Sequence, residues 1–172
     1  AIPELLPKAV RATGLSIAYA LGVTVFGGTT QFIVTALIAA MRANPSCGIA
    51  TPVLRCDAES VGHFIEDRRN GRVGATTVVS NNLGQALYFS KEVIPYAGRD
   101  FAPDEITPVF HHVGVYAYRP AALAEYPTWP EGRLEALEGL EQLRFLERGR
   151  RILCVEVEAR GREFWELNNP SD

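Results

Sequence analysis

Hydrophobic and polar residues divide this chain near residue 41. Ala12–Met41 is a run of 30 residues without one charged side chain. As a helix this run would be about 45 Å long, and a bilayer core requires roughly 20 apolar residues. Two interpretations stay open: a membrane-spanning helix with Lys8 and Arg11 as its cytoplasmic flank, or a buried segment of a soluble protein, broken at Gly27 and Gly28.

After Met41 the pattern changes to alternating strands and helices. Apolar or alternating runs predict strands over 48–56, 74–81, 109–119 and 152–159. Helical spacing predicts helices over 57–70, capped by Asp57 or Ser60, and over 132–149, ended by Gly149. Pro120 opens a further short helix. The order of these elements predicts an α/β fold.

Composition and charge exclude some function classes. The chain has 172 residues and a net charge of -3, which suits one domain but not a protein that binds nucleic acid through a basic surface. Its cysteines, Cys47, Cys56 and Cys154, form no C-x-x-C pair, and their odd number fits reduced thiols. No histidine lies at ligand spacing from Cys47 or Cys56, so a zinc site is not predicted.

A first family resemblance covers residues 4–35. The segment ELLPKAVRATGLSIAYALGVTVFGGTTQFIVT resembles one transmembrane segment of a major facilitator proton symporter of the proline/betaine type, on its RATG entry and FGGTTQ turn. One such helix cannot form a transport path. The resemblance implies possible membrane contact through 12–41, and a division of the chain into a transporter-like segment, 1–35, and a second part, 36–172.

The second part resembles another family, the CMP-KDO synthetases (3-deoxy-manno-octulosonate cytidylyltransferases). Four ordered motifs carry the resemblance: QALYFSKEVIPY, HHVGVYAYRP, LEGLEQLRFLERG and VEVEARGREFWELNNPSD. It implies an incomplete nucleotidyltransferase-like mixed sheet with flanking helices, here preceded by a hydrophobic helical segment. It also implies a cytoplasmic homodimer that uses magnesium, CTP and a KDO-type sugar acid in lipopolysaccharide synthesis.

The resemblance assigns residues to the sugar side of the reaction. His112, Tyr116, Glu141 and Gln142 stand at the family's sugar-contacting positions, and Asn168 stands where the family has a metal-binding aspartate. An amide oxygen is a weaker ligand than a carboxylate for a hard cation. Without the resemblance, His112 would be interpreted as an ordinary strand histidine, and Glu141 and Gln142 as a solvated helix face.

The nucleotide side of the reaction has no counterpart in the sequence. The family's Gly/Arg/Lys-rich loop and its Gln-Gly-Asp segment do not occur in these 172 residues, so catalytic residues stay unknown. We therefore expect a truncated or chimeric relative of a cytidylyltransferase that is inactive alone. The alternatives are a membrane-anchored fragment of a proton symporter and a non-catalytic, self-associating module.

Overall fold

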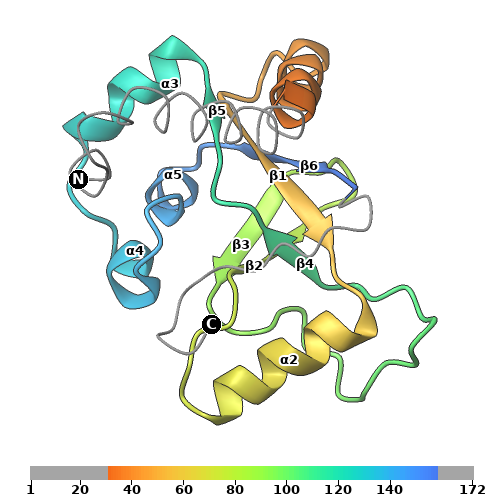
Figure 1. Cartoon of the computed structure of the whole chain (residues 1–172). Coiled ribbons are helices and arrows are strands. Elements are labelled where there is room, and N and C mark those ends of the chain that lie inside the picture. Colours follow the sequence, from red (N-terminus) through yellow and green to blue (C-terminus); the bar gives the residue numbers. More distant parts are fainter. Residues whose placement is uncertain (1–30, 159–172) are drawn as a thin grey trace, which may run out of the picture. The chain divides into compact units, whose positions relative to one another are not determined.

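The computed structural model describes residues 31–158 (Figure 1). The chain forms two compact units, Ala1–Thr35 and Ala36–Asp172, and the sheet lies in the second. Residues 31–35 of the first unit are helical, as are residues 36–43 of the second. The strands are β1 (Ile49–Arg55), β2 (Thr77–Ser80), β3 (Ala86–Ser90), β4 (Phe110–His112), β5 (Ala117–Tyr118) and β6 (Ile152–Glu156). The helices are α2 (Ala58–Arg69), α3 (Pro120–Glu125), the 3-10 turn η3 (Tyr126–Thr128), α4 (Arg133–Glu138) and α5 (Leu143–Glu147).

The six strands form one mixed sheet around β1. β6 pairs with β1 in parallel, whereas β4 and β5 pair with its two halves in antiparallel orientation. β2 and β3 form a hairpin that extends the sheet beyond β4. The hairpin turn also reaches β6, because Cys154 donates its N–H to the carbonyl of Gly84 at 2.8 Å. The predicted α/β class with a mixed sheet and flanking helices is confirmed.

The segment 109–119 is two short strands, not the single strand that its alternation predicts. Val53 pairs with His112, and Ala50 pairs with Ala117. The two positions are three residues apart on β1 but five residues apart in the segment 112–117, which therefore contains two extra residues. The hydroxyl of Thr51, fully buried on β1, donates to the carbonyls of Val113 and Val115 at 3.2 and 2.8 Å. These bonds hold the chain in a bulge between β4 and β5.

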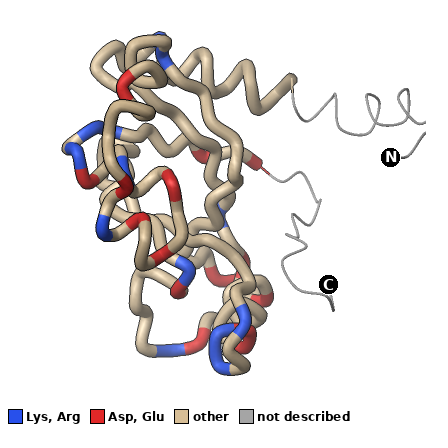
Figure 2. The backbone as a smooth tube through the Cα atoms, turned by 90° about the vertical axis from the view of Figure 1, so that its left-hand side faces the viewer, with Lys and Arg blue, Asp and Glu red and all other residues tan. Residues whose placement is uncertain are grey.

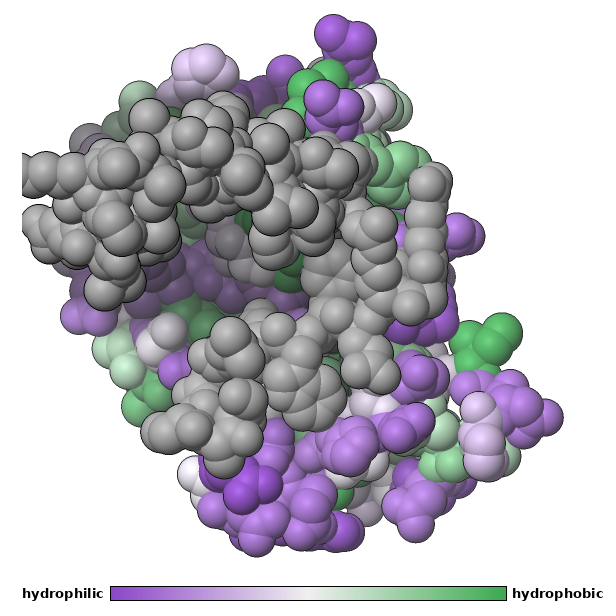
Figure 3. Space-filling view, viewed as in Figure 1, coloured by the Kyte–Doolittle hydropathy of each residue, from purple (hydrophilic) through white to green (hydrophobic). Residues whose placement is uncertain are grey.

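Helix α2 forms where the hydrophobic spacing predicts it. The carboxylate of Asp57 accepts the N–H of Ser60 at 2.8 Å, which identifies Asp57 as the N-cap. Val61 and Phe64 are buried, and hydrophilic side chains gather on the outer side of the helix at the lower edge of Figure 3. Apart from the helical residues 31–41, which carry no charge, basic and acidic residues are interspersed on the face that Figure 2 shows.

The long helix predicted over 132–149 is wrong. It is divided into α4 and α5 at Gly139, which has a φ of +63°. A left-handed residue ends a helix, and glycine adopts that conformation without a steric penalty. Leu137 is therefore 72% exposed instead of buried on a continuous apolar stripe. The turn between the two helices, residues 139–142, becomes one wall of the candidate site.

No helix within residues 31–158 is long and apolar enough to cross a membrane. Most of the predicted hydrophobic run, residues 12–30, lies outside the described residues. The transmembrane interpretation therefore gains no support from the structure.

Candidate functional site

A pocket of about 500 Å³ lies between the bulge that follows β4 and the turn between α4 and α5. His112 and Tyr116 contribute to it from the bulge side, and Glu141 and Gln142 from the turn. The structure thus brings together all four residues that the sequence nominated for a sugar. The other lining residues are Thr76, Gly114, Tyr118, Leu123, Tyr126, Gly139, Leu140 and Phe145.

His112 is held firmly at the back of this pocket. Its imidazole Nε2 lies 3.1 Å from the hydroxyl oxygen of Thr51, and only 4% of the residue is exposed. Phe89 packs edge-on against the ring, with 5.0 Å between ring centroids. These contacts fix the orientation of the ring, as recognition of a ligand requires.

Aromatic rings continue from His112 along one side of the pocket. Tyr116 lies 5.4 Å from His112 between centroids, Tyr118 follows at 5.7 Å, and Phe145 at 5.8 Å from Tyr118. Tyr126 stacks on Phe145 at 5.1 Å. The pKa of the Tyr118 hydroxyl is raised, first by burial and then by the neighbouring Tyr126 and the carboxylate of Glu141. The hydroxyl therefore stays protonated at neutral pH and able to donate.

Glu141 and Gln142 differ sharply in their surroundings. Glu141 is exposed at the pocket edge, whereas Gln142 is only 6% exposed. The amide nitrogen of Gln142 is buried and has no hydrogen-bond partner among the described residues. An unsatisfied buried donor costs about 1–3 kcal/mol, and such groups are rare in native proteins, so this donor calls for a partner such as water or a ligand. The solvated helix face, which the sequence without the resemblance predicts, therefore does not describe Gln142.

A buried ion pair joins α4 and α5, the helices on either side of the turn. Glu135 of α4 accepts from Arg144 of α5 through both carboxylate oxygens, at 2.5 and 2.6 Å. The Arg144 guanidinium also lies 4.3 Å from the centre of the Tyr126 ring. In return, Glu147 of α5 accepts the N–H of Leu134 at the start of α4, at 3.0 Å. These contacts fix residues 139–142 and so the position of Glu141 and Gln142.

The sequence analysis did not predict the Glu135–Arg144 ion pair or, apart from Tyr116, the aromatic side chains of the pocket. Glu135 and Arg144 are nine residues apart, a separation with no meaning along one continuous helix. Only the helix break at Gly139 brings them face to face. The LEGL sequence, with a glycine inside a helical pattern, was the available signal.

Metal ligands do not gather in the part of the chain that the structure describes. Residues 31–158 contain no group of three or more His, Cys, Asp or Glu side chains placed to hold a metal ion. Burial raises the pKa of the Cys56 and Cys154 thiols to about 12, so neither is a thiolate ligand at neutral pH. Asn168, the proposed metal position, lies outside the described residues.

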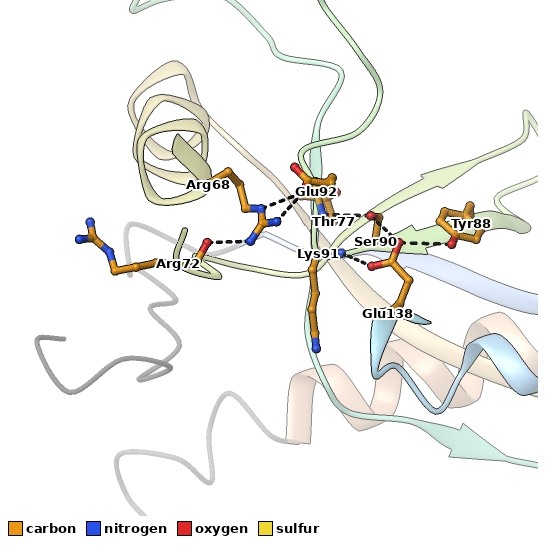
Figure 4. Close-up of polar contacts among 8 residues, drawn as sticks. All are labelled: Arg68, Arg72, Thr77, Tyr88, Ser90, Lys91, Glu92 and Glu138. Atoms are coloured by element: carbon orange, nitrogen blue, oxygen red, sulfur yellow. Dashed lines mark hydrogen bonds and ion pairs between the residues drawn. The ribbon is translucent and has the colours of Figure 1, made fainter. Parts of the chain in front are cut away.

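A larger hollow, of about 660 Å³, lies between α2 and residues 92–101. Arg68 forms an ion pair with Glu92 beside it (Figure 4), and Arg72 is paired with Asp67. None of the residues nominated for sugar binding lines this hollow. The smaller pocket is the better candidate because its buried, unpaired amide and its aromatic wall suit a polyhydroxylated ring.

Comparisons with known proteins connect this geometry to a family. A family model described as Cytidylyltransferase matches residues 58–152. The 3-deoxy-manno-octulosonate cytidylyltransferase of Maricaulis maris is 39% identical over 132 residues, covering 77% of this chain and 50% of that protein. The protein of the same name from Acinetobacter baumannii is 51% identical over 119 residues, covering 67% of this chain and 44% of its own.

A solved structure extends the likeness to the fold. CMP:2-keto-3-deoxy-manno-octonic acid synthetase complexed with CTP aligns with a TM-score of 0.60 and 32% identity, over 80% of this chain and 51% of that one. This chain therefore spans about half the length of the relatives it matches. The resemblance of residues 4–35 to a proton symporter gains no support from these relatives, and the alternative functions gain none either.

Proposed function

Because this chain belongs to the cytidylyltransferase family, we propose that it supplies the sugar-acid pocket for cytidylyl transfer from CTP to a KDO-type acid. One observation carries the proposal: His112, Tyr116, Glu141 and Gln142, nominated by motif alone, line a single pocket. The relatives from Maricaulis maris and Acinetobacter baumannii are named for the acid 3-deoxy-manno-octulosonate. A reaction that consumes CTP belongs to the cytoplasm, and we propose that location.

The pocket offers suitable groups for a polyhydroxylated ring. The Glu141 carboxylate accepts hydrogen bonds from hydroxyl groups, and the unpartnered Gln142 amide nitrogen donates to a hydroxyl or ring oxygen. The Tyr116 and Tyr118 rings provide an apolar surface for the C–H face of the sugar. In the transfer itself, the sugar 2-hydroxyl oxygen bonds to the α-phosphorus of CTP and gives up its proton to solvent. The bond from the α-phosphorus to the bridging oxygen breaks, and its electron pair leaves with pyrophosphate.

Among residues 31–158, we assign no side chain to magnesium or to CTP. The described range, 31–158, has no three-ligand cluster, so we derive no step through a metal ion. The Gly/Arg/Lys-rich loop and the Gln-Gly-Asp segment of the resemblance are not in the sequence. We therefore expect residues 1–172 alone to bind the sugar acid without turning it over.

Calorimetric titration of the chain with KDO tests the pocket. Glu141→Gln should weaken binding about tenfold, as expected when a hydrogen bond to a charged group is lost. Glu131→Gln is the matched control, because Glu131 is exposed and does not line the pocket. Wild-type chain that binds no KDO at millimolar concentration, or equal binding by both variants and wild type, would contradict the proposal.

A pyrophosphate-release assay with CTP, KDO and magnesium tests the expected inactivity of the chain alone. We expect no release above the enzyme-free blank, because each missing phosphate contact is worth about two orders of magnitude in rate. Release that is lost on Glu141→Ala would overturn this expectation and place a complete active site within residues 1–172.

A further inference from the structure

One buried hydroxyl group contacts both the bulge and His112 of the candidate pocket. Thr51 lies on β1, is 0% exposed, and its side-chain oxygen contacts three polar atoms within residues 31–158. The carbonyl oxygens of Val113 and Val115 lie at 3.2 and 2.8 Å, and His112 Nε2 lies at 3.1 Å. Thr51 is not among the residues that line the pocket. It therefore acts on a ligand through the groups that it holds.

The single proton of this hydroxyl is directed to the bulge. A threonine hydroxyl donates one hydrogen bond and accepts up to two. A carbonyl oxygen only accepts, so the contacts with Val113 and Val115 both depend on the Thr51 proton. The 2.8 Å contact with Val115 has the usual length of an O–H···O bond. The proton is therefore not available to His112.

His112 must then donate to Thr51. With its own proton engaged, the Thr51 oxygen can only accept from the ring, and 3.1 Å is an ordinary N–H···O distance. A neutral imidazole carries one proton, so a proton on Nε2 leaves Nδ1 as an acceptor. A ligand hydroxyl that meets Nδ1 of the neutral ring therefore has to donate.

We infer that Thr51 is a positioning residue of the sugar-acid pocket, which fixes His112 in its Nε2-protonated form and couples this form to the bulge. The effect on the ligand rests on the proposed function. A neutral ring with its proton on Nε2 favours ligand groups that donate, such as hydroxyls, over groups that only accept, such as ethers. Thr51→Val would keep the shape of the side chain but remove the oxygen that selects this form.

Nitrogen-15 NMR of the 172-residue chain tests the tautomer directly. After assignment of the three histidines, the ring nitrogens of His112 show which one carries the proton, at a pH above the titration of that ring. We expect one form, protonated on Nε2, in wild type and in Thr51→Ser, which keeps the hydroxyl. Thr51→Val should show both tautomers. A wild-type proton on Nδ1 would overturn the inference, and this result requires no variant to fold.

Calorimetric titration with KDO tests the consequence for the pocket. Thr51→Val should bind about tenfold more weakly than wild type, as expected for a lost hydrogen bond, and Thr51→Ser should keep most of the affinity. Thr107→Val is the matched control. The Thr107 hydroxyl is equally buried and donates to the Cys56 carbonyl at 2.5 Å, but Thr107 does not line the pocket. This control should lose stability in urea unfolding and keep the wild-type affinity.

The outcomes separate this inference from the proposed function. An unchanged tautomer or an unchanged affinity in Thr51→Val would overturn the role of Thr51 and leave the pocket assignment standing. Equal weakening in Thr107→Val would do the same, because the effect would then follow from lost stability alone. A wild-type chain that binds no KDO would overturn the proposed function, whereas the position of the His112 proton would still decide whether Thr51 fixes the ring.

Discussion

Replacing Glu135 by glutamine should destabilise the fold strongly, because this carboxylate is the centre of the turn that forms the pocket. Glu135 is only 4% exposed, and its two oxygens each accept one N–H of Arg144. Either orientation of a glutamine amide would turn an NH₂ group toward one of these donors. The variant would therefore leave the Arg144 guanidinium partly buried, at 16% side-chain exposure, and without its counter-charge.

The expected loss in free energy of unfolding follows from the contacts that Arg144 keeps and those that it loses. Breaking a buried ion pair by removing one partner costs about 3–5 kcal/mol. Arg144 retains its position over the Tyr126 ring and its hydrogen bond to the Trp129 carbonyl, so we expect the lower end, about 3 kcal/mol. Against a typical total stability of about 5–15 kcal/mol, this is a large fraction.

Urea unfolding followed by circular dichroism measures the change, with exposed Glu131→Gln as the control. The combined variant Glu135→Leu with Arg144→Met should lose less than Glu135→Gln alone, because no charge is left buried. A Glu135→Gln chain within about 0.5 kcal/mol of wild type would refute the reasoning, since that is the range of ordinary surface substitutions.

The same pair predicts a dependence on pH. The hydrogen bonds from Arg144 hold the pKa of Glu135 below its usual value, against the opposing effect of burial. A carboxyl whose pKa is lower in the folded state stabilises the protein above its unfolded pKa of about 4.3, and this contribution is lost as pH falls through the folded value. The stability difference between wild type and Glu135→Gln should therefore shrink below about pH 4.

Three further outcomes are expected. Asp57→Ala should cost about 1 kcal/mol in urea unfolding through loss of the α2 N-cap, whereas exposed Glu59→Ala should cost much less; equal losses would exclude the cap. Gly139→Ala should cost about 1–2 kcal/mol in urea unfolding for its left-handed φ, and should also weaken KDO binding because Gly139 lies in the turn that lines the pocket; unchanged calorimetric affinity would contradict the second part. Light scattering should show a dimer that Val115→Asp dissociates without unfolding, because Val115 is 44% exposed; a monomeric wild type would end this prediction.

Local pattern predicted the elements whose formation depends on local interactions. Helix α2 forms where apolar spacing and a capping aspartate agree, and Pro120 occupies the first turn of α3 as expected. The strand at Ile49–Arg55 is buried along nearly its whole length, which is what a continuous apolar run predicts for a central strand. For the two helices, neighbouring residues in sequence supply the determining contacts, whereas the strand also depends on its distant partners β4, β5 and β6.

The bulge between β4 and β5 could not be predicted in this way. The alternation of Val109–Arg119 is that of one strand, but the Thr51 hydroxyl accommodates two extra residues by bonding to the carbonyls of Val113 and Val115. Thr51 is more than 60 residues away in sequence. A pattern confined to one segment contains no information about a partner that comes from another strand.

Both errors of the sequence-based prediction fall on the two walls of the candidate pocket, and this has a physical reason. A regular strand through 109–119 and a regular helix through 132–149 would place their side chains at fixed periods and present no concave turn. His112 and Tyr116 on the bulge side and Glu141 and Gln142 in the turn after Gly139 line the same pocket. Each irregularity is held by a buried polar contact, Thr51 in one wall and Glu135 with Arg144 in the other. The cavity thus forms where the bulge after β4 and the break at Gly139 depart from regular structure. Removing the contacts that hold these departures, those of Thr51 and of Glu135 with Arg144, should affect ligand binding most.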